Sequence, residues 1–177
     1  MLLGWAGAFR RSELTNLDAE DIRFTSREMV VTLRFSKTDQ EGRGTKKRIP
    51  MLDDETLCPV RALKAWMNAA SIKRGPLFRP VDRWGHVRRG RMTNQSVALV
   101  VKHVAKVAGL DPRQFAGHSL RSGFATQAAT DLVPEWSIAE MTGHKSREVL
   151  GRYIRDAGLG QMSAIRRAFG ETNHFIS

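Results

Sequence analysis

The sequence contains a single tyrosine, Tyr153, which stands between two arginines and follows a Gly-His pair. A phenol can attack a phosphodiester when cationic groups bind the non-bridging oxygens, because negative charge builds there in the transition state. The reaction also needs a base for the phenol proton and an acid for the departing 5′ oxygen. A half-buried packing residue is the alternative role for this tyrosine. Tyr153 is therefore a candidate nucleophile if suitable partners accompany it.

The segment GHSLRSGFAT supplies two such partners, His118 and Arg121. On a helix a spacing of three residues puts both side chains on one face, within reach of one ligand. The imidazole could handle a proton while the guanidinium binds two phosphate oxygens. The alternative is a histidine that packs locally and an arginine that is solvated or paired with an acid.

A second arginine with a nearby carboxylate occurs in GAFRRSEL, where Glu13 follows Arg10 by three residues. A carboxylate at that spacing can hold the guanidinium in place and leave other donors for a ligand. Arg11 is either the exposed neighbour or the residue that takes the role of Arg10. A surface ion pair is the alternative interpretation.

Composition supports a polyanionic partner, since the formal net charge is +11 and the pI is about 10.8. Basic residues concentrate in residues 34–48 and 73–91, and neither cluster has the pattern of an amphipathic basic helix. Nucleic acid is therefore favoured over an anionic membrane. The apolar opening MLLGWAGAF is too short to span a bilayer. The single cysteine, Cys58, rules out an internal disulfide.

The elements expected to position these residues are mainly helical, with a small antiparallel sheet, an α+β class. Apolar periodicity and turn residues predict strands over 22–24, 29–35 and 46–50, with a turn over 39–44. A helix with a break near Gly7 is expected over 2–17, and Pro59 begins another over 59–72 with Val60, Leu63, Trp66 and Ala70 inside. Thr93 caps a helix that ends at Gly109, with an apolar stripe of Val97, Val100, Val101, Val104 and Ala108. Four further helices are predicted over 118–130, 134–141, 146–153 and 161–168.

In this order the segments GAFRRSEL, SKTDQ, HSLR and TGHKSREVLGRY resemble the signature of the tyrosine recombinases, the phage integrase family. The resemblance runs from about residue 1 to about residue 155. It implies a nucleophile, Tyr153, that forms a 3′-phosphotyrosyl bond. It implies phosphate binding by Arg10 and Arg121, with Glu13 supporting Arg10 and with His118 and His144 aiding hydrogen bonding and proton transfer. Lys37 matches the hairpin lysine that protonates the leaving 5′ oxygen, although Lys46 or Lys47 could reach the same atom.

The same resemblance implies a single catalytic domain over residues 1–177, with a tail at 155–177 that carries a short helix. No cofactor or metal is required. Double-stranded DNA is the expected partner, and the tail helix is expected to dock on a neighbouring subunit in a synaptic tetramer. We expect the family's N-terminal core-binding domain to be absent, either because the sequence is a fragment or because the gene is a truncated remnant. The expected location is the cytoplasm, at the nucleoid.

Two other functions remain open from the sequence. A type IB topoisomerase uses the same catalytic groups to relax DNA, although the short interval from His144 to Tyr153 favours a recombinase. The second is a catalytically silent DNA-binding remnant, which truncation of the family's N-terminal half would leave.

Overall fold

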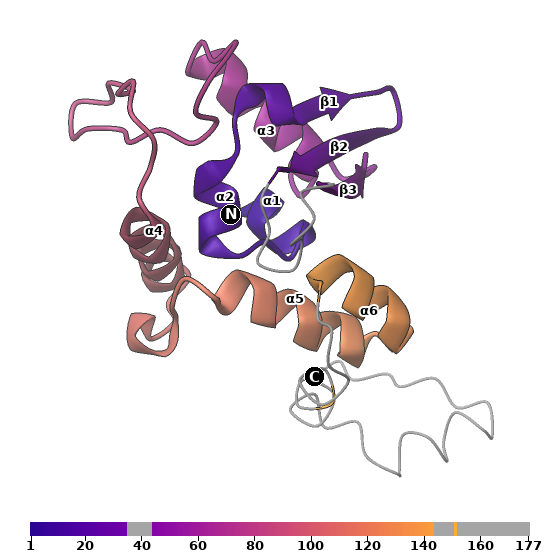
Figure 1. Cartoon of the computed structure of the whole chain (residues 1–177). Helices are drawn as coiled ribbons and strands as arrows, with labels where there is room; N and C mark the ends of the chain where they lie inside the picture. Colours follow the sequence, from indigo (N-terminus) through magenta and orange to yellow (C-terminus); the bar gives the residue numbers. More distant parts are fainter. Residues whose placement is uncertain (35–43, 144–150, 152–177) are drawn as a thin grey trace, which may run out of the picture. The chain divides into compact units, whose positions relative to one another are not determined.

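The computed structural model describes residues 1–34, 44–143 and 151 of the chain. Within this part it contains six α-helices and a three-stranded antiparallel sheet, which confirms the mainly helical α+β prediction. The chain divides into two compact units, residues 1–121 and residues 122–177 (Figure 1).

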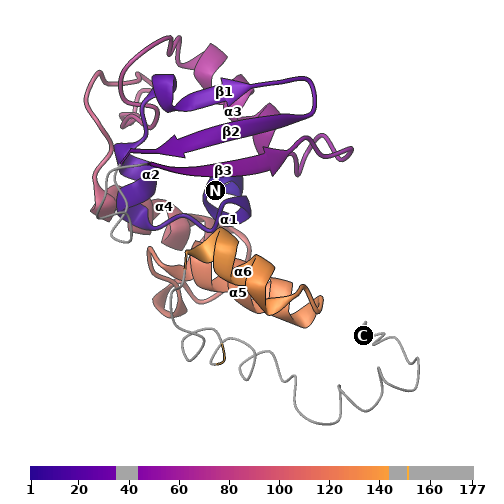
Figure 2. The same cartoon turned by 45° about the vertical axis from the view of Figure 1, so that its right-hand side comes forward.

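The sheet lies in the first unit and has the strand order β1-β2-β3 (Figure 2). Its strands are β1 (Ile22–Phe24), β2 (Glu28–Leu33) and β3 (Thr45–Pro50). In the β2–β3 register Met29 pairs with Ile49 and Val31 pairs with Lys47. Met29, Val31 and Ile49 are buried. Since alternate residues of a strand share a face, Lys47 points to the same apolar side as Ile49.

The predicted first helix is broken near Gly7, as expected. Helix α1 (Leu2–Ala6) ends at that glycine, and α2 (Arg11–Asn16) begins after the segment 7–10, here called the α1–α2 turn. Ala8 has a φ of 47°, a left-handed conformation that cannot continue a right-handed helix. A short 3-10 helix, η1 (Ala19–Asp21), then leads into β1.

Helix α3 (Pro59–Ala69) lies beside the sheet (Figures 1 and 2) and is shorter than the predicted 59–72. It ends early because Ser71 adopts a φ of 51° and the Ile72 amide then donates to the Met67 carbonyl at 2.8 Å. Val60 and Leu63 are buried as predicted, and the Trp66 indole donates to the Leu77 carbonyl at 2.9 Å. The core of this unit comprises Leu3, Phe9, Leu14, Leu17, Met29, Val31, Leu33, Ile49, Cys58, Val60, Leu63, Leu77, Val97, Val101 and Leu120.

Helix α4 (Asn94–Val107) confirms the Thr93 cap, whose hydroxyl accepts from the Ser96 amide at 3.1 Å. The predicted apolar stripe is wrong in part. Val97, Val101 and Ala105 are buried, whereas Val100 and Val104 are 41% and 40% exposed and Ala108 is exposed. Helix α4 packs along the side that meets α2, and such a contact covers one row of residues four apart. A 3-10 helix, η2 (Pro112–Gln114), follows.

Helix α5 (Ser119–Thr130) starts at the end of the first unit, and α6 (Glu135–Thr142) lies in the second. Both agree with the predicted helices to within about one residue. The second unit has its own small core of Ala125, Ala128, Ala129 and Ile138. Gly143, with a φ of 65°, ends α6 in the left-handed conformation that favours glycine. Apart from residue 151, the predicted helices over 146–153 and 161–168 lie outside the described residues.

Candidate active site

The α1–α2 turn is the centre around which the predicted site residues of the first unit gather. Phe9 is fully buried, and its amide donates to the Gly4 carbonyl at 3.0 Å. A Cβ on Gly7 would overlap the Phe9 ring, so glycine is required where the ring folds back over the turn. With Ala8 left-handed, the carbonyls of Gly7 and Ala8 are both directed at side chains from other elements.

Arg10 and Glu13 form the pair that the sequence predicts. The Arg10 guanidinium donates to one Glu13 carboxylate oxygen at 2.6 Å, and the Arg10 amide donates to the other at 2.8 Å. Glu13 is 5% exposed and Arg10 is 29% exposed, so the carboxylate is held inside while the arginine reaches the surface. Because Arg10 is also the N-cap of α2, the same carboxylate fixes both its backbone and its side chain.

Arg121 reaches the same turn from α5. Its side chain is buried, and its Nη1 donates to the Ala8 carbonyl at 3.0 Å. The donor and acceptor are 113 positions apart in the sequence. The structure therefore brings Arg121 to a carbonyl only two residues before Arg10.

His118 lies in the turn directly before α5 and is exposed. The prediction that His118 and Arg121 share one face of a helix is therefore wrong for His118. Ser119 closes this turn, because its hydroxyl accepts from the Ala116 amide at 2.9 Å. Arg11 is the exposed neighbour of Arg10, and its side chain lies so close to Gly117 that a Cβ there would overlap it. The alternative in which Arg11 takes the role of Arg10 thus loses support.

Lys47 is the residue whose position sequence reasoning missed. It is buried on β3, its ammonium donates to the Gly7 carbonyl, and it lies 4.7 Å from the centroid of the Phe9 ring. Burial lowers the pKa of Lys47 to about 8, an effect that Glu13 opposes and that Arg121 and Arg10 reinforce. The two-residue alternation of a strand could have revealed this burial, since Lys47 stands two residues before Ile49 and shares its inward face. Lys46, by contrast, is exposed.

Lys37, His144 and Tyr153 lie outside the described residues. Their assignments stay predictions from the sequence. No cluster of His, Cys, Asp and Glu within the described ranges could hold a metal ion. Over the same ranges, no helix is long and apolar enough to cross a membrane.

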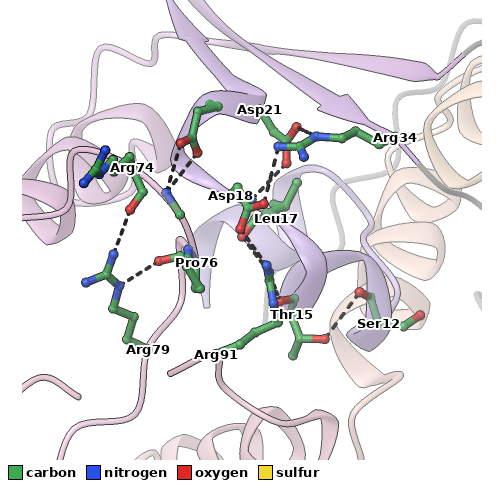
Figure 3. Close-up of polar contacts among 12 residues, drawn as sticks. Ser12, Thr15, Leu17, Asp18, Asp21, Arg34, Arg74, Pro76, Arg79 and Arg91 are labelled. Atoms are coloured by element: carbon green, nitrogen blue, oxygen red, sulfur yellow. Dashed lines mark hydrogen bonds and ion pairs between the residues drawn. The ribbon is translucent and has the colours of Figure 1, made fainter. Parts of the chain in front are cut away.

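Two acidic residues of η1 and its N-cap, Asp21 and Asp18, pair with two arginines of the predicted basic clusters (Figure 3). The Arg34 Nε donates to an Asp21 oxygen at 2.5 Å, and the Arg91 Nη2 donates to an Asp18 oxygen at 2.6 Å. Arg91 also donates to the Thr15 carbonyl at 2.6 Å. These arginines connect the end of β2 and the segment before α4 to η1 and to the C-terminal end of α2. Their main role is therefore structural.

Residues 78–92, here called the basic hairpin, overlap the second basic cluster and form an ordered turn. Val81 pairs with Val87 in an antiparallel bridge, and the Arg88 amide donates to the Pro80 carbonyl at 2.8 Å. Asp82 accepts from two backbone amides at the tip and pairs with the Arg88 guanidinium at 2.9 Å. At the tip Trp84 is 64% exposed, and the Arg83 guanidinium stacks 4.2 Å from its ring centroid.

The family model described as the phage integrase family matches residues 1–158 of this chain. The chain belongs to the phage integrase family. An integrase/recombinase XerD homologue from Selenomonas ruminantium is 43% identical over 169 residues, which are 96% of this chain and 50% of the relative. A tyrosine recombinase XerD from Xanthomonas axonopodis pv. citri is 30% identical over 81% of this chain and 45% of its own length. This family member therefore spans about half the length of the curated relatives it matches.

Solved structures show the same fold. The XerH site-specific recombinase, in a post-cleavage complex with a palindromic difH substrate, matches with a TM-score of 0.66 and 17% identity. That match covers 96% of this chain and 43% of XerH. The XerA recombinase matches with a TM-score of 0.62 and 17% identity, over 97% of this chain and 57% of its own.

Proposed function

We propose that this phage integrase family member carries the catalytic machinery of a DNA strand transferase that cleaves and rejoins strands through a 3′-phosphotyrosyl intermediate. One observation carries the proposal: Arg10, held by Glu13, and Arg121, held by the Ala8 carbonyl, meet at one turn. A guanidinium has five N–H donors, so one can fix the side chain while others bind an anion. Two arginines fixed in this way form a preorganised site for a phosphodiester.

In the proposed reaction the Tyr153 oxygen attacks the scissile phosphorus and the bond from phosphorus to the 5′ oxygen breaks. Arg10 and Arg121 stabilise the charge on the non-bridging oxygens. Lys37 gives a proton to the leaving 5′ oxygen. His118 or His144 accepts the phenol proton of Tyr153, and both histidines support the site through hydrogen bonds. The phosphotyrosyl bond keeps the energy needed to rejoin the strand, so neither a metal nor a nucleotide is required.

Double-stranded DNA is the proposed partner. A net charge of +11 favours a polyanion, and the XerH relative was solved with its DNA substrate. The exposed tip of the basic hairpin, with Arg83 and Trp84, offers a second contact to the duplex outside the α1–α2 turn. Such contacts add affinity and register without reading base sequence.

Assembly is a further part of the proposal. The helix predicted over 161–168 would dock on a neighbouring subunit, so that four subunits hold two duplexes in a synaptic complex. Work on DNA would place the protein in the cytoplasm, at the nucleoid. Cross-linking in the presence and absence of bound DNA, with the chain truncated after residue 158, tests this helix: truncation should leave DNA binding intact and remove the cross-linked oligomers.

The central experiment uses a library of nicked duplexes with a randomised core. Cleavage next to the nick releases a short fragment, so the covalent adduct cannot be reversed and survives denaturing electrophoresis. The wild-type chain should form this adduct, and Tyr153→Phe should abolish it while retaining DNA binding.

Other outcomes identify the other functions. DNA binding without any adduct from the wild-type chain would favour a silent DNA-binding remnant and overturn the proposal. Adduct formation at all sequences, together with relaxation of supercoiled plasmid, would favour topoisomerase chemistry.

A further inference from the structure

Lys47 is a buried cation at the α1–α2 turn, and the roles assigned above do not use it. We propose that Lys47 is a positioning residue of the phosphate site: its ammonium fixes the Gly7 carbonyl and adds positive charge beneath Arg10 and Arg121. This inference rests on the proposed strand-cleavage function. It assigns to Lys47 no direct contact with DNA.

The first support is the bracing of the turn. Lys47 donates to the Gly7 carbonyl from β3, and Arg121 donates to the next carbonyl, that of Ala8, from α5. Two consecutive peptide groups are thereby held by cations from two elements that are far apart in the sequence. Arg10 follows Ala8 by two residues, so a rotation of either peptide group would reorient Arg10. A displacement of about 1 Å in such a residue is enough to slow a reaction about 100-fold.

The second support is the depth of Lys47. Its side chain is only 7% exposed, and its ammonium lies over the face of the fully buried Phe9 ring. An ammonium held between a carbonyl and an aromatic face is stabilised by both contacts. At this depth the ammonium is shielded from solvent and from direct contact with a bound duplex. Lys47 is therefore suited to act through the arginines rather than as the acid for the leaving 5′ oxygen.

The third support is the charge around Lys47. Glu13 on α2 attracts its ammonium, whereas Arg10 and Arg121 repel it, and its partner across the sheet, Val31, is apolar. Burial and the two arginines lower the pKa of Lys47 to about 8. A bound phosphodiester adds one negative charge close to the arginines and so favours the protonated lysine. Cleavage should thus weaken as pH rises through the region where Lys47 loses its proton.

The test measures single-turnover adduct formation on a nicked duplex selected with the wild-type chain. Lys47→Met removes both the carbonyl bond and the charge, and we expect it to slow cleavage by about 10- to 100-fold with little change in DNA affinity. Lys47→Gln keeps a donor for the Gly7 carbonyl, and we expect it to recover part of the rate. The matched control is Lys64→Met, since Lys64 is an exposed lysine of α3 whose ammonium also lies over a phenylalanine ring, 5.0 Å from the Phe24 centroid. This control should cleave at the wild-type rate.

The pH profile separates charge from packing. From about pH 7 to about pH 9.5 the wild-type rate should fall relative to that of Lys47→Gln, since only the wild-type chain has the Lys47 charge to lose and all other titrating groups are common to both. A 5′-thio leaving group, which departs without a proton, separates positioning from acid catalysis. On the 5′-thio substrate, Lys47→Met should remain slower than the wild-type chain by the same factor as on the ordinary substrate.

The inference is overturned if Lys47→Met and Lys64→Met cleave at the same rate, or if the 5′-thio substrate restores the cleavage rate of Lys47→Met. It is also overturned if the rate ratio of wild type to Lys47→Gln is constant with pH. If Lys47→Met does not fold, as judged by its melting curve, the pH profile of Lys47→Gln decides alone. Failure of the proposed function looks different, because the wild-type chain itself would then form no adduct.

Discussion

The α1–α2 turn and the basic hairpin both carry cations that suit a phosphate, but the two regions hold them in opposite ways. At the turn Arg121 and Lys47 are buried, and each donates to a backbone carbonyl. At the hairpin Arg83 and Arg88 are exposed, and their partners are an exposed ring and a single carboxylate. Charge in a low-dielectric, fixed setting acts strongly on one bound group, whereas exposed charge is screened by salt.

This difference separates two tasks. Under the proposed function, the buried cations of the turn act in the reaction, because their geometry is set before the substrate arrives. Exposed cations serve affinity, because they adapt to many phosphates and release counterions. The net charge of the chain does not distinguish the buried cations from the exposed ones. Four predictions test this division, in order of decreasing effect.

The largest effect is expected at Arg121. Arg121→Met removes a fixed donor from the phosphate site and should slow adduct formation by about 100- to 1000-fold at saturating protein. Arg113→Met is the matched control, since Arg113 is exposed and pairs only with Asp111 among the interactions of the described residues. An Arg121→Met chain that folds and cleaves at the wild-type rate would contradict the assignment of this arginine.

The second effect concerns stability and pH. The pKa of Lys47 is about 8 in the folded chain against an ordinary value of 10.5, so between these values the unfolded chain binds more protons. The free energy of unfolding should therefore rise as pH increases through this window, by about 2 to 3 kcal/mol relative to Lys47→Met. Urea titrations at several pH values measure the difference. A constant difference between the two chains would show that Lys47 is solvated in the folded state.

A smaller effect is expected at Glu13. Glu13→Gln keeps an acceptor for the Arg10 amide but removes the charge that holds the guanidinium, and cleavage should slow about tenfold. Glu55→Gln serves as the control, because Glu55 also pairs with an arginine, Arg61, but on the surface. Such exposed pairs contribute little. Equal rates for the two variants would mean that the buried carboxylate does not orient Arg10.

The smallest effect is expected at the basic hairpin. The double variant Arg83→Ala, Trp84→Ala should weaken binding to a duplex a few-fold and lower the salt dependence by about one phosphate contact. Its cleavage rate at saturating protein should equal that of the wild type. Fluorescence anisotropy over a range of salt concentrations measures the first quantity, and adduct formation measures the second. A large loss of rate at saturation would remove the distinction between the two regions.

Much of the fold was predictable because local signals were strong. Pro59 and Thr93 mark helix starts, Gly7 marks a helix break, and the three strands follow from alternation and turns. The errors lie where tertiary contact decides the outcome. Whether Val100 and Val104 are inside depends on the width of the α4 contact, and the periodicity of one helix cannot measure that width.

The candidate site divides in the same way. The sequence by itself determined the ordered motifs, the family and the local Arg10–Glu13 pair, because a spacing of three residues sets that contact without help from the rest of the chain. Only the tertiary structure decided that Arg121 and Lys47 meet at consecutive carbonyls of one turn, since those contacts span 113 and 40 positions. Such contacts depend on how β3, α5 and the α1–α2 turn pack. That packing holds two basic residues at adjacent carbonyls of one turn.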